Sequence, residues 1–227
     1  FVLCWFDVGE TNTNRSASMM KQIRAYPELL RSGRFWGYSL CIAFSTGAFY
    51  AFLGGAPLVA VAIFEISPAR LGFYIGSITA GFMFGSFLAG RFSARYELTT
   101  VMIAGRLIAC GGLSVGLLLV ASGQVYQLIL FGACACVGIG NGITMPSANA
   151  GCMAVRPGLA GSASGVSAAL TNAGGGALAA FTGTVLSAEN AAWGLITIML
   201  AASALGLAAA IYVRKAERQM STAVGTV

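Results

Sequence analysis

Six long apolar runs, separated by short polar turns, constrain the fold of this chain more than any other feature. Each run reaches the roughly 20 residues that an α-helix needs to cross the hydrocarbon core of a bilayer. Backbone polar groups find no water in that core, so spanning segments must be helices or closed barrels, and runs this long favour helices. We therefore predict an all-α membrane protein with six transmembrane helices. The predicted spans are residues 35–64, 71–90, 98–121, 125–155, 160–186 and 191–213.

The composition supports a lipid environment. Of the 227 residues, 57% are hydrophobic and only 9% are charged, whereas a soluble domain carries about 25% charged residues. The lipid bilayer is therefore the first expected partner. The formal net charge of +6 does not indicate nucleic-acid binding, because the basic residues stand at the ends of apolar runs and form no basic patch.

The basic residues fall on alternate loops and so predict a topology. Eleven of the thirteen would lie on one side of the membrane, which the positive-inside rule identifies as the cytoplasmic side. Arg70 would lie on the opposite side, and Arg106 lies inside the third span. The eleven are Arg15, Lys21, Arg24, Arg31, Arg34, Arg91, Arg95, Arg156, Arg214, Lys215 and Arg218.

This topology divides the chain into four parts. Residues 1–6 are interpreted as the end of a preceding transmembrane helix, and residues 7–34 as a cytoplasmic connector. Residues 35–213 form the six-helix transmembrane bundle. Residues 214–227 form a cytoplasmic tail, whose small-residue end is expected to be disordered.

Several enzyme classes are disfavoured by the residue types present. The chain has no histidine, so it cannot supply a Ser-His triad. Cys134 and Cys136 are two residues apart on a predicted helix, so they point to different faces and are interpreted as packing residues. Gly138 to Gly142 lies in mid-span, where a dinucleotide-binding loop cannot form. We predict no enzymatic activity, no metal site and no cofactor.

Pairs of glycines four residues apart predict close helix packing. Such spacing lets helix backbones approach where lipid offers no hydrophobic drive between them. The pairs are Gly72 and Gly76, Gly81 and Gly85, Gly112 and Gly116, and Gly161 and Gly165.

Arg106 is the single ionisable residue inside a span. One interpretation is that its side chain snorkels to the interface or braces the loop that holds Arg91 and Arg95. The alternative is a role in substrate or coupling chemistry.

Two spans combine a proline with polar residues. Pro57 and Pro146 are expected to kink or partly unwind their helices. Broken helices with buried amides build transporter sites near the midplane, although ordinary hydrogen bonds between helices explain such residues equally well. The candidates for a substrate cavity are Ser45, Phe49, Tyr50, Asn141, Met145, Asn149, Thr171 and Asn172.

Motifs throughout the chain resemble the C-terminal half of a major facilitator transporter, of the bicyclomycin and chloramphenicol resistance (Bcr/CflA) type of drug:proton antiporter. The chain departs from that pattern at Ser147 and Asn172, where the branch is expected to carry Asn and Gln. The segments that carry the resemblance are Glu10-Thr11, Arg31-Ser-Gly-Arg-Phe35, Gly54-Gly-Ala-Pro57, Phe64-Glu-Ile-Ser-Pro68, Gly85-Ser-Phe-Leu-Ala-Gly-Arg91, Gly138-Ile-Gly-Asn-Gly142 with Pro146, and Ala160-Gly-Ser-Ala-Ser164.

The resemblance implies a fold and a set of roles. The six spans would be helices seven to twelve, with the first, second, fourth and fifth lining a central cavity. A separate N-terminal six-helix half would close the cavity and hold the proton-coupling acid. Arg106 would then be structural. The protein would lie in a bacterial inner membrane with its C-terminus in the cytoplasm. The residues expected to act in structure or gating are Pro57, Gly85, Gly90, Arg91, Arg95, Arg106 and Pro146.

The leading hypothesis is a secondary transporter that exports small amphipathic drugs or metabolites in exchange for protons by alternating access. One alternative is a half-size protein that pairs with itself or with another half. The other is a membrane protein with a structural role and no transport activity.

Overall fold

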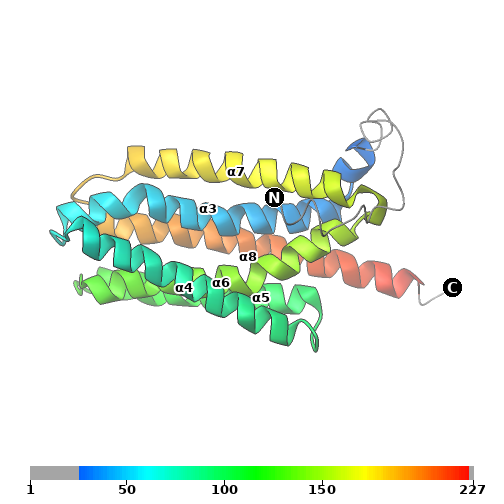
Figure 1. Cartoon of the computed structure of the whole chain (residues 1–227), viewed down its shortest axis with the longest axis horizontal. Helices are drawn as coiled ribbons and strands as arrows, with labels where there is room; N and C mark the ends of the chain where they lie inside the picture. Colours follow the sequence, from blue (N-terminus) through cyan, green and yellow to red (C-terminus); the bar gives the residue numbers. More distant parts are fainter. Residues whose placement is uncertain (1–25, 225–227) are drawn as a thin grey trace, which may run out of the picture.

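The computed structural model describes residues 26–224, with side chains to residue 220, and this part of the chain contains six long α-helices and no strand. The helices run alternately up and down along the long axis of the molecule (Figure 1). The predictions for residues 1–6 and for most of the connector lie outside the described residues. The helices are α3 (Gly33–Ala62), α4 (Pro68–Phe92), α5 (Leu98–Ala121), α6 (Gln127–Ala154), α7 (Ala160–Val185) and α8 (Ala191–Val224).

The helices form two groups of three. In one group α3 packs against both α7 and α8, and in the other α6 packs against both α4 and α5. Contacts of α5 with α8 and of α3 with α6 join the two groups. As a result α3 and α6 are central, while α4 and α7 lie at the edges (Figure 1).

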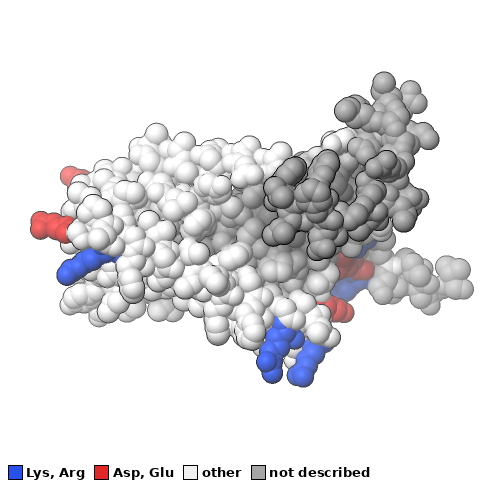
Figure 2. Space-filling model, in the orientation of Figure 1, with Lys and Arg blue, Asp and Glu red and all other residues white. Residues whose placement is uncertain are grey.

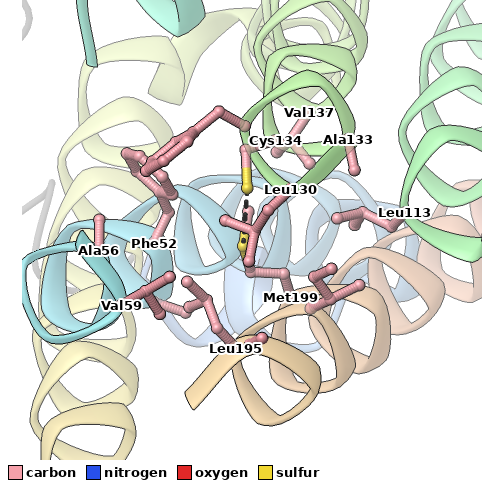
Figure 3. Packing of buried hydrophobic residues seen from close by; sticks show 14 of the residues in the cluster. Phe52, Ala56, Val59, Leu113, Leu130, Ala133, Cys134, Val137, Leu195 and Met199 are labelled. Atoms are coloured by element: carbon pink, nitrogen blue, oxygen red, sulfur yellow. Dashed lines mark hydrogen bonds between the residues drawn. The ribbon is translucent and has the colours of Figure 1, made fainter. Parts of the chain in front are cut away.

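The main apolar core lies where α3, α5, α6 and α8 meet (Figure 3). Phe52 of α3, Leu130 of α6 and Leu195 of α8 are all fully buried there. Cys134 is buried in the same cluster, with its Sγ 3.8 Å from the Sδ of Met199. Cys134 therefore packs as a small apolar residue, as the sequence predicted.

Five of the six helices have both the length and the hydropathy to cross a membrane. The exception is α7, which is long enough at 26 residues but carries serine, threonine, asparagine and several glycines among its apolar residues. Charged side chains gather near the two ends of the face shown in Figure 2, and a wide uncharged band separates them in its described part.

Both prolines lie inside continuous helices. Pro57 is within α3 and Pro146 is within α6, so the predicted partial unwinding of these helices is wrong, while the predicted kinks stay predictions. A proline removes one backbone donor and is tolerated in membrane helices where neighbouring groups compensate.

Two of the four predicted glycine pairs mediate close helix contacts. A Cβ atom on Gly85 of α4 would overlap the Ile139 carbonyl oxygen of α6, and one on Gly142 of α6 would overlap the Phe82 carbonyl oxygen of α4. The pair Gly112 and Gly116 similarly brings α5 against α6. Each of these glycines removes the side chain that would hold two backbones apart.

The other two pairs do not pack within the described chain. A Cβ atom on any of Gly72, Gly76, Gly161 and Gly165 would meet nothing within 4 Å. These glycines lie on α4 and α7, the two edge helices, so the packing predicted for them is wrong for this part of the molecule.

Helix α8 continues past the predicted end of the last span at Val213 and ends at Val224. The predicted disorder of the tail is therefore wrong as far as residue 224. The segment after Val213 contains Ala, Glu, Arg, Gln and Met, which are favourable helix formers. Glu217 also anchors it, because its Oε1 accepts hydrogen bonds from Arg34 at 2.9 Å and from the Tyr38 hydroxyl at 2.6 Å.

We expect the substitution Glu217→Gln to lower the melting temperature of the detergent-solubilised protein by about 1–4 °C. The amide can still accept one hydrogen bond, but the ion pair with Arg34 is lost, and a half-exposed pair contributes at most about 1 kcal/mol. Glu189→Gln, in the exposed turn between α7 and α8, is the matched control and should leave the melting temperature unchanged. Equal shifts for the two variants would contradict the assigned role of Glu217.

Candidate functional site

Helices α3, α4, α6 and α7 build one face of the bundle, and the two edge helices of this face, α4 and α7, are little buried. The edge helices bury few residues within the described chain: α4 buries three of 25 and α7 buries five of 26. Helix α6, by contrast, buries fifteen of 28. The edge helices therefore present long stretches that no other described helix covers.

A pocket of about 300 Å³ lies on this face between α3, α4 and α6. Three predicted cavity residues line it, namely Phe49, Asn141 and Met145. The remaining lining residues are Thr46, Ile78, Thr79, Phe82 and Gly138. The pocket combines apolar and aromatic surface with a few polar groups, which is the usual character of a small-molecule site.

Tyr50 and Asn172 meet across the gap between α3 and α7. The Tyr50 hydroxyl donates to the Asn172 Oδ1 at 3.3 Å, and Asn172 Nδ2 donates to the Ala168 carbonyl oxygen at 2.9 Å. Gly175 of α7 lets the Tyr50 ring lie against the helix, because a Cβ there would come within 2.5 Å of the ring. The structure thus brings two more of the predicted residues together.

The other predicted polar residues do not line the pocket. Ser45 and Thr171 are buried, and each hydroxyl donates to a carbonyl oxygen one turn earlier in its own helix, at 2.5 Å and 2.7 Å. Asn149 is exposed near the end of α6. Ser45 still contributes its backbone, because its carbonyl oxygen accepts a hydrogen bond of 2.9 Å from Asn141 Nδ2.

Arg106 lies at the centre of the bundle behind this pocket. Its side chain is fully buried between α5 and its neighbours. Its Nε donates to Thr144 Oγ1 at 3.1 Å, and its Nη2 donates to Asn141 Oδ1. Gly206 of α8 lies close enough that a Cβ there would be 3.4 Å from the Arg106 Cδ.

The prediction that Arg106 snorkels to the interface or braces the loop between α4 and α5 is wrong. A side chain can snorkel only if its helix position faces lipid near an interface, whereas Arg106 faces α6. The polar partners on α6, Asn141 and Thr144, hold it in the interior instead.

The residues expected to act in gating are spread over two environments. Gly85 is buried at the contact of α4 with α6, while Gly90, Arg91 and Arg95 are exposed at the end of α4 and in the following turn. Pro57 and Pro146 are exposed on their helices. The geometry brings none of these residues into the pocket.

A larger hollow of about 430 Å³ lies between α3 and α7. It is lined only by apolar residues, among them Phe44, Leu170 and Phe181. A hollow without polar groups offers nothing to orient a ligand, so it is the weaker candidate. Within the described residues, no three His, Cys, Asp or Glu side chains gather as a metal site would require.

Comparison with known protein families resolves the class of the protein. A family model described as Major Facilitator Superfamily matches residues 1–180, which is well over half of the chain. This chain belongs to the Major Facilitator Superfamily. The predicted fold class, an all-α membrane protein with a six-helix half-bundle of the major facilitator fold, is confirmed, and the protein is a multi-pass membrane protein.

One relative within the Major Facilitator Superfamily is a protein of Bacillus subtilis (strain 168), described as "Uncharacterized MFS-type transporter YdgK". It is 29% identical over 96 residues, which cover 39% of this chain and 24% of the relative. The chain thus matches about a quarter of the length of that curated relative. No solved structure matches the chain.

The resemblance implied that the second span, which is α4, lines the cavity, but no residue of α4 was among the predicted cavity residues. Ile78, Thr79 and Phe82 carry no motif, and their side chains reach the pocket only because Gly138 and Gly142 let α4 lie against α6. The signal that could have found them is the facing glycine spacing on the two helices.

Proposed function

We propose that this chain forms one wall of a secondary transporter of the Bcr/CflA type, which exports small amphipathic compounds in exchange for protons by alternating access. Membership of the superfamily and the distant likeness to a transporter support the general class. The observation that carries the proposal is the pocket between α3, α4 and α6, where the Asn141 amide stands among aromatic and thioether side chains.

The distribution of acidic residues supports a transporter in which this chain provides the substrate pocket and another part provides the proton-coupling acid. The carboxylates among the described residues are Glu28, Glu65, Glu97, Glu189 and Glu217, and all lie in turns or near helix ends. Proton relays in transporters usually use carboxylates within the membrane. The coupling acid in this proposal therefore belongs to a second six-helix half, which faces the pocket across the cavity.

The positions of the basic residues support an orientation. Arg34, Arg91, Arg95 and Arg156 belong to one end of the bundle and Arg70 to the other. By the positive-inside rule the first end is cytoplasmic. The proposal thus places the protein in a bacterial inner membrane, with the C-terminus in the cytoplasm.

Drug accumulation tests the proposed transport activity. The full-length gene is expressed in an efflux-deficient bacterial strain, and the uptake of chloramphenicol, bicyclomycin and fluorescein is measured with and without a protonophore. We expect the steady-state level of at least one compound to fall severalfold, and the protonophore to restore it. The substitution Leu118→Ala, on the outward side of α5, should export like the parent. Unchanged accumulation of all three compounds would contradict the proposal.

A further inference from the structure

Arg106 is a buried cation without a described counterion. None of its guanidinium is exposed, and arginine stays protonated in proteins. Its Nη1 has no hydrogen-bond partner among the described residues. Two ion pairs in the described part of the chain, Arg34 with Glu217 and Arg156 with Glu28, lie at the ends of the helices, away from Arg106. A buried charge without a counterion is costly, and an anion bound nearby would offset part of that cost.

The guanidinium fixes how Asn141 faces the pocket. Arginine can only donate hydrogen bonds, so the Asn141 oxygen must be the atom that faces Arg106. The Asn141 Nδ2 then points away from Arg106, and one of its two hydrogens is held by the Ser45 carbonyl oxygen at 2.9 Å. No described residue accepts the second hydrogen, and because Asn141 lines the pocket we infer that this hydrogen is free to be donated to a ligand there.

The other polar groups of the pocket add no negative charge. The Thr79 hydroxyl donates to the Ile75 carbonyl oxygen at 3.3 Å, and the Thr46 hydroxyl donates to the Met145 Sδ at 3.8 Å. The rest of the lining is apolar, with Phe49 and Phe82 as its aromatic members. A ligand in this pocket therefore meets an apolar surface, one amide donor and the field of a buried cation one side chain away.

We propose that this pocket selects amphipathic anions, or the anionic end of an amphipathic weak acid, over organic cations of similar size. The inference rests on the transporter function proposed above and names its substrate class. The charged or electron-rich oxygen of the substrate accepts from Asn141 Nδ2, and its apolar body packs on Phe49 and Phe82. At an effective dielectric constant of about 20, a buried unit charge one side chain away changes the affinity of an anion relative to a cation by a factor of about ten or more.

Equilibrium binding of two related dyes tests this selectivity without requiring transport. The full-length protein is reconstituted in lipid nanodiscs, and the binding of fluorescein, which is anionic at neutral pH, is compared with that of rhodamine 123, which is cationic. Empty nanodiscs provide the background. We expect fluorescein to bind at least about tenfold more tightly than rhodamine 123, and added salt to weaken the preference only slightly because the charge is buried.

Three variants assign the preference to the buried cation. Arg106→Gln should bring the two dissociation constants to within about threefold of each other. Asn141→Asp places a carboxylate beside the intact Arg106 and should abolish the preference in the same way, which decides the question if Arg106→Gln does not fold. Arg70→Gln removes an exposed arginine in the first turn of α4, outside the pocket lining, and should keep the parent preference.

Each outcome bears on the inference. Equal or tighter binding of rhodamine 123 by the parent protein would overturn it, as would the binding of neither dye. A fluorescein preference that survives in Asn141→Asp would also overturn it, since the buried charge would not be its source. The protein could also bind fluorescein selectively and yet not move it along a proton gradient in proteoliposomes. That result would contradict the transport proposal but would support the assigned ligand class.

Discussion

The substitution Gly142→Ala is expected to lower the melting temperature of the detergent-solubilised protein by about 6–12 °C. The added methyl group would overlap the Phe82 carbonyl oxygen and lie 2.8 Å from the Ser86 amide nitrogen. Both atoms belong to the backbone of α4, so the clash is relieved only by moving the helix. Overpacking of this kind costs about 3 kcal/mol, which corresponds to the stated change for a chain of this size.

The matched control lies on the same helix. A Cβ atom on Gly132 of α6 would meet nothing within 4 Å, and alanine is a better helix former than glycine by up to about 1 kcal/mol. Gly132→Ala should therefore leave the melting temperature unchanged or raise it slightly. If Gly142→Ala and Gly132→Ala had the same melting temperature, the close approach of α4 to α6 would not be a source of stability. A displaced α4 would also carry Ile78 and Phe82 away from the pocket.

The substitution Asn141→Leu is expected to lower the melting temperature by about 4–10 °C. Leucine is similar in size to asparagine but neither accepts nor donates a hydrogen bond, so Arg106 Nη2 loses its acceptor and the Ser45 carbonyl oxygen loses its donor. A buried hydrogen bond to a charged group contributes about 1.5–3 kcal/mol, and leaving the charge unpaired adds to the loss. Thermal unfolding followed by fluorescence-detected size exclusion measures the change.

Two further variants serve as controls for the melting temperature of Asn141→Leu. Asn149→Leu alters an exposed asparagine of the same helix and should leave the melting temperature within about 2 °C of the parent. Asn141→Asp gives Arg106 a counterion but loses the hydrogen bond to the Ser45 carbonyl oxygen, so it should melt below the parent and well above Asn141→Leu. A drop in the aspartate variant as large as that in the leucine variant would show that Arg106 is not the partner that makes Asn141 important.

Sequence reasoning reached the architecture because the membrane leaves few solutions. Several apolar runs of 20 residues or more in one chain favour spanning helices. The turns between them stand where the apolar pattern breaks, and Gly123 and Glu65 in two of these turns have positive φ values of 86° and 49°. The helix boundaries were less predictable at the C-terminus. The contact of Glu217 with Arg34 and Tyr38 joins residues that are far apart in the chain, and no local sequence pattern predicts it.

The candidate site could be predicted only in part, for a geometric reason. A polar side chain inside a membrane span needs a hydrogen-bond partner, and this requirement identified Asn141, Tyr50 and Asn172 as candidates. The sequence does not show which residue on which neighbouring helix is the partner of each. Arg106 was expected at an interface because its depth along the helix is visible in the sequence, whereas the direction in which it points depends on how α5 rotates against α6.

The same limit applies to the glycines. Spacing identified Gly85 and Gly112 as packing positions equally with Gly76 and Gly161, but only the first two meet a neighbouring helix in the described chain. The difference arises from the place of each helix in the bundle. A central helix is covered on several sides, and an edge helix leaves some of its glycines without a contact.

The central claim is that the face formed by α3, α4, α6 and α7 borders a water-filled substrate pathway, while the outer side of α5 faces lipid. Cysteine labelling in intact membranes tests it most directly, using a membrane-impermeant maleimide and a full-length protein whose native cysteines are replaced by alanine. Thr79→Cys and Asn172→Cys should be labelled, and a transported compound should slow the labelling. Leu107→Cys and Leu118→Cys, both exposed on α5, should remain unlabelled. Labelling at the two α5 positions with none at Thr79 and Asn172 would contradict the account.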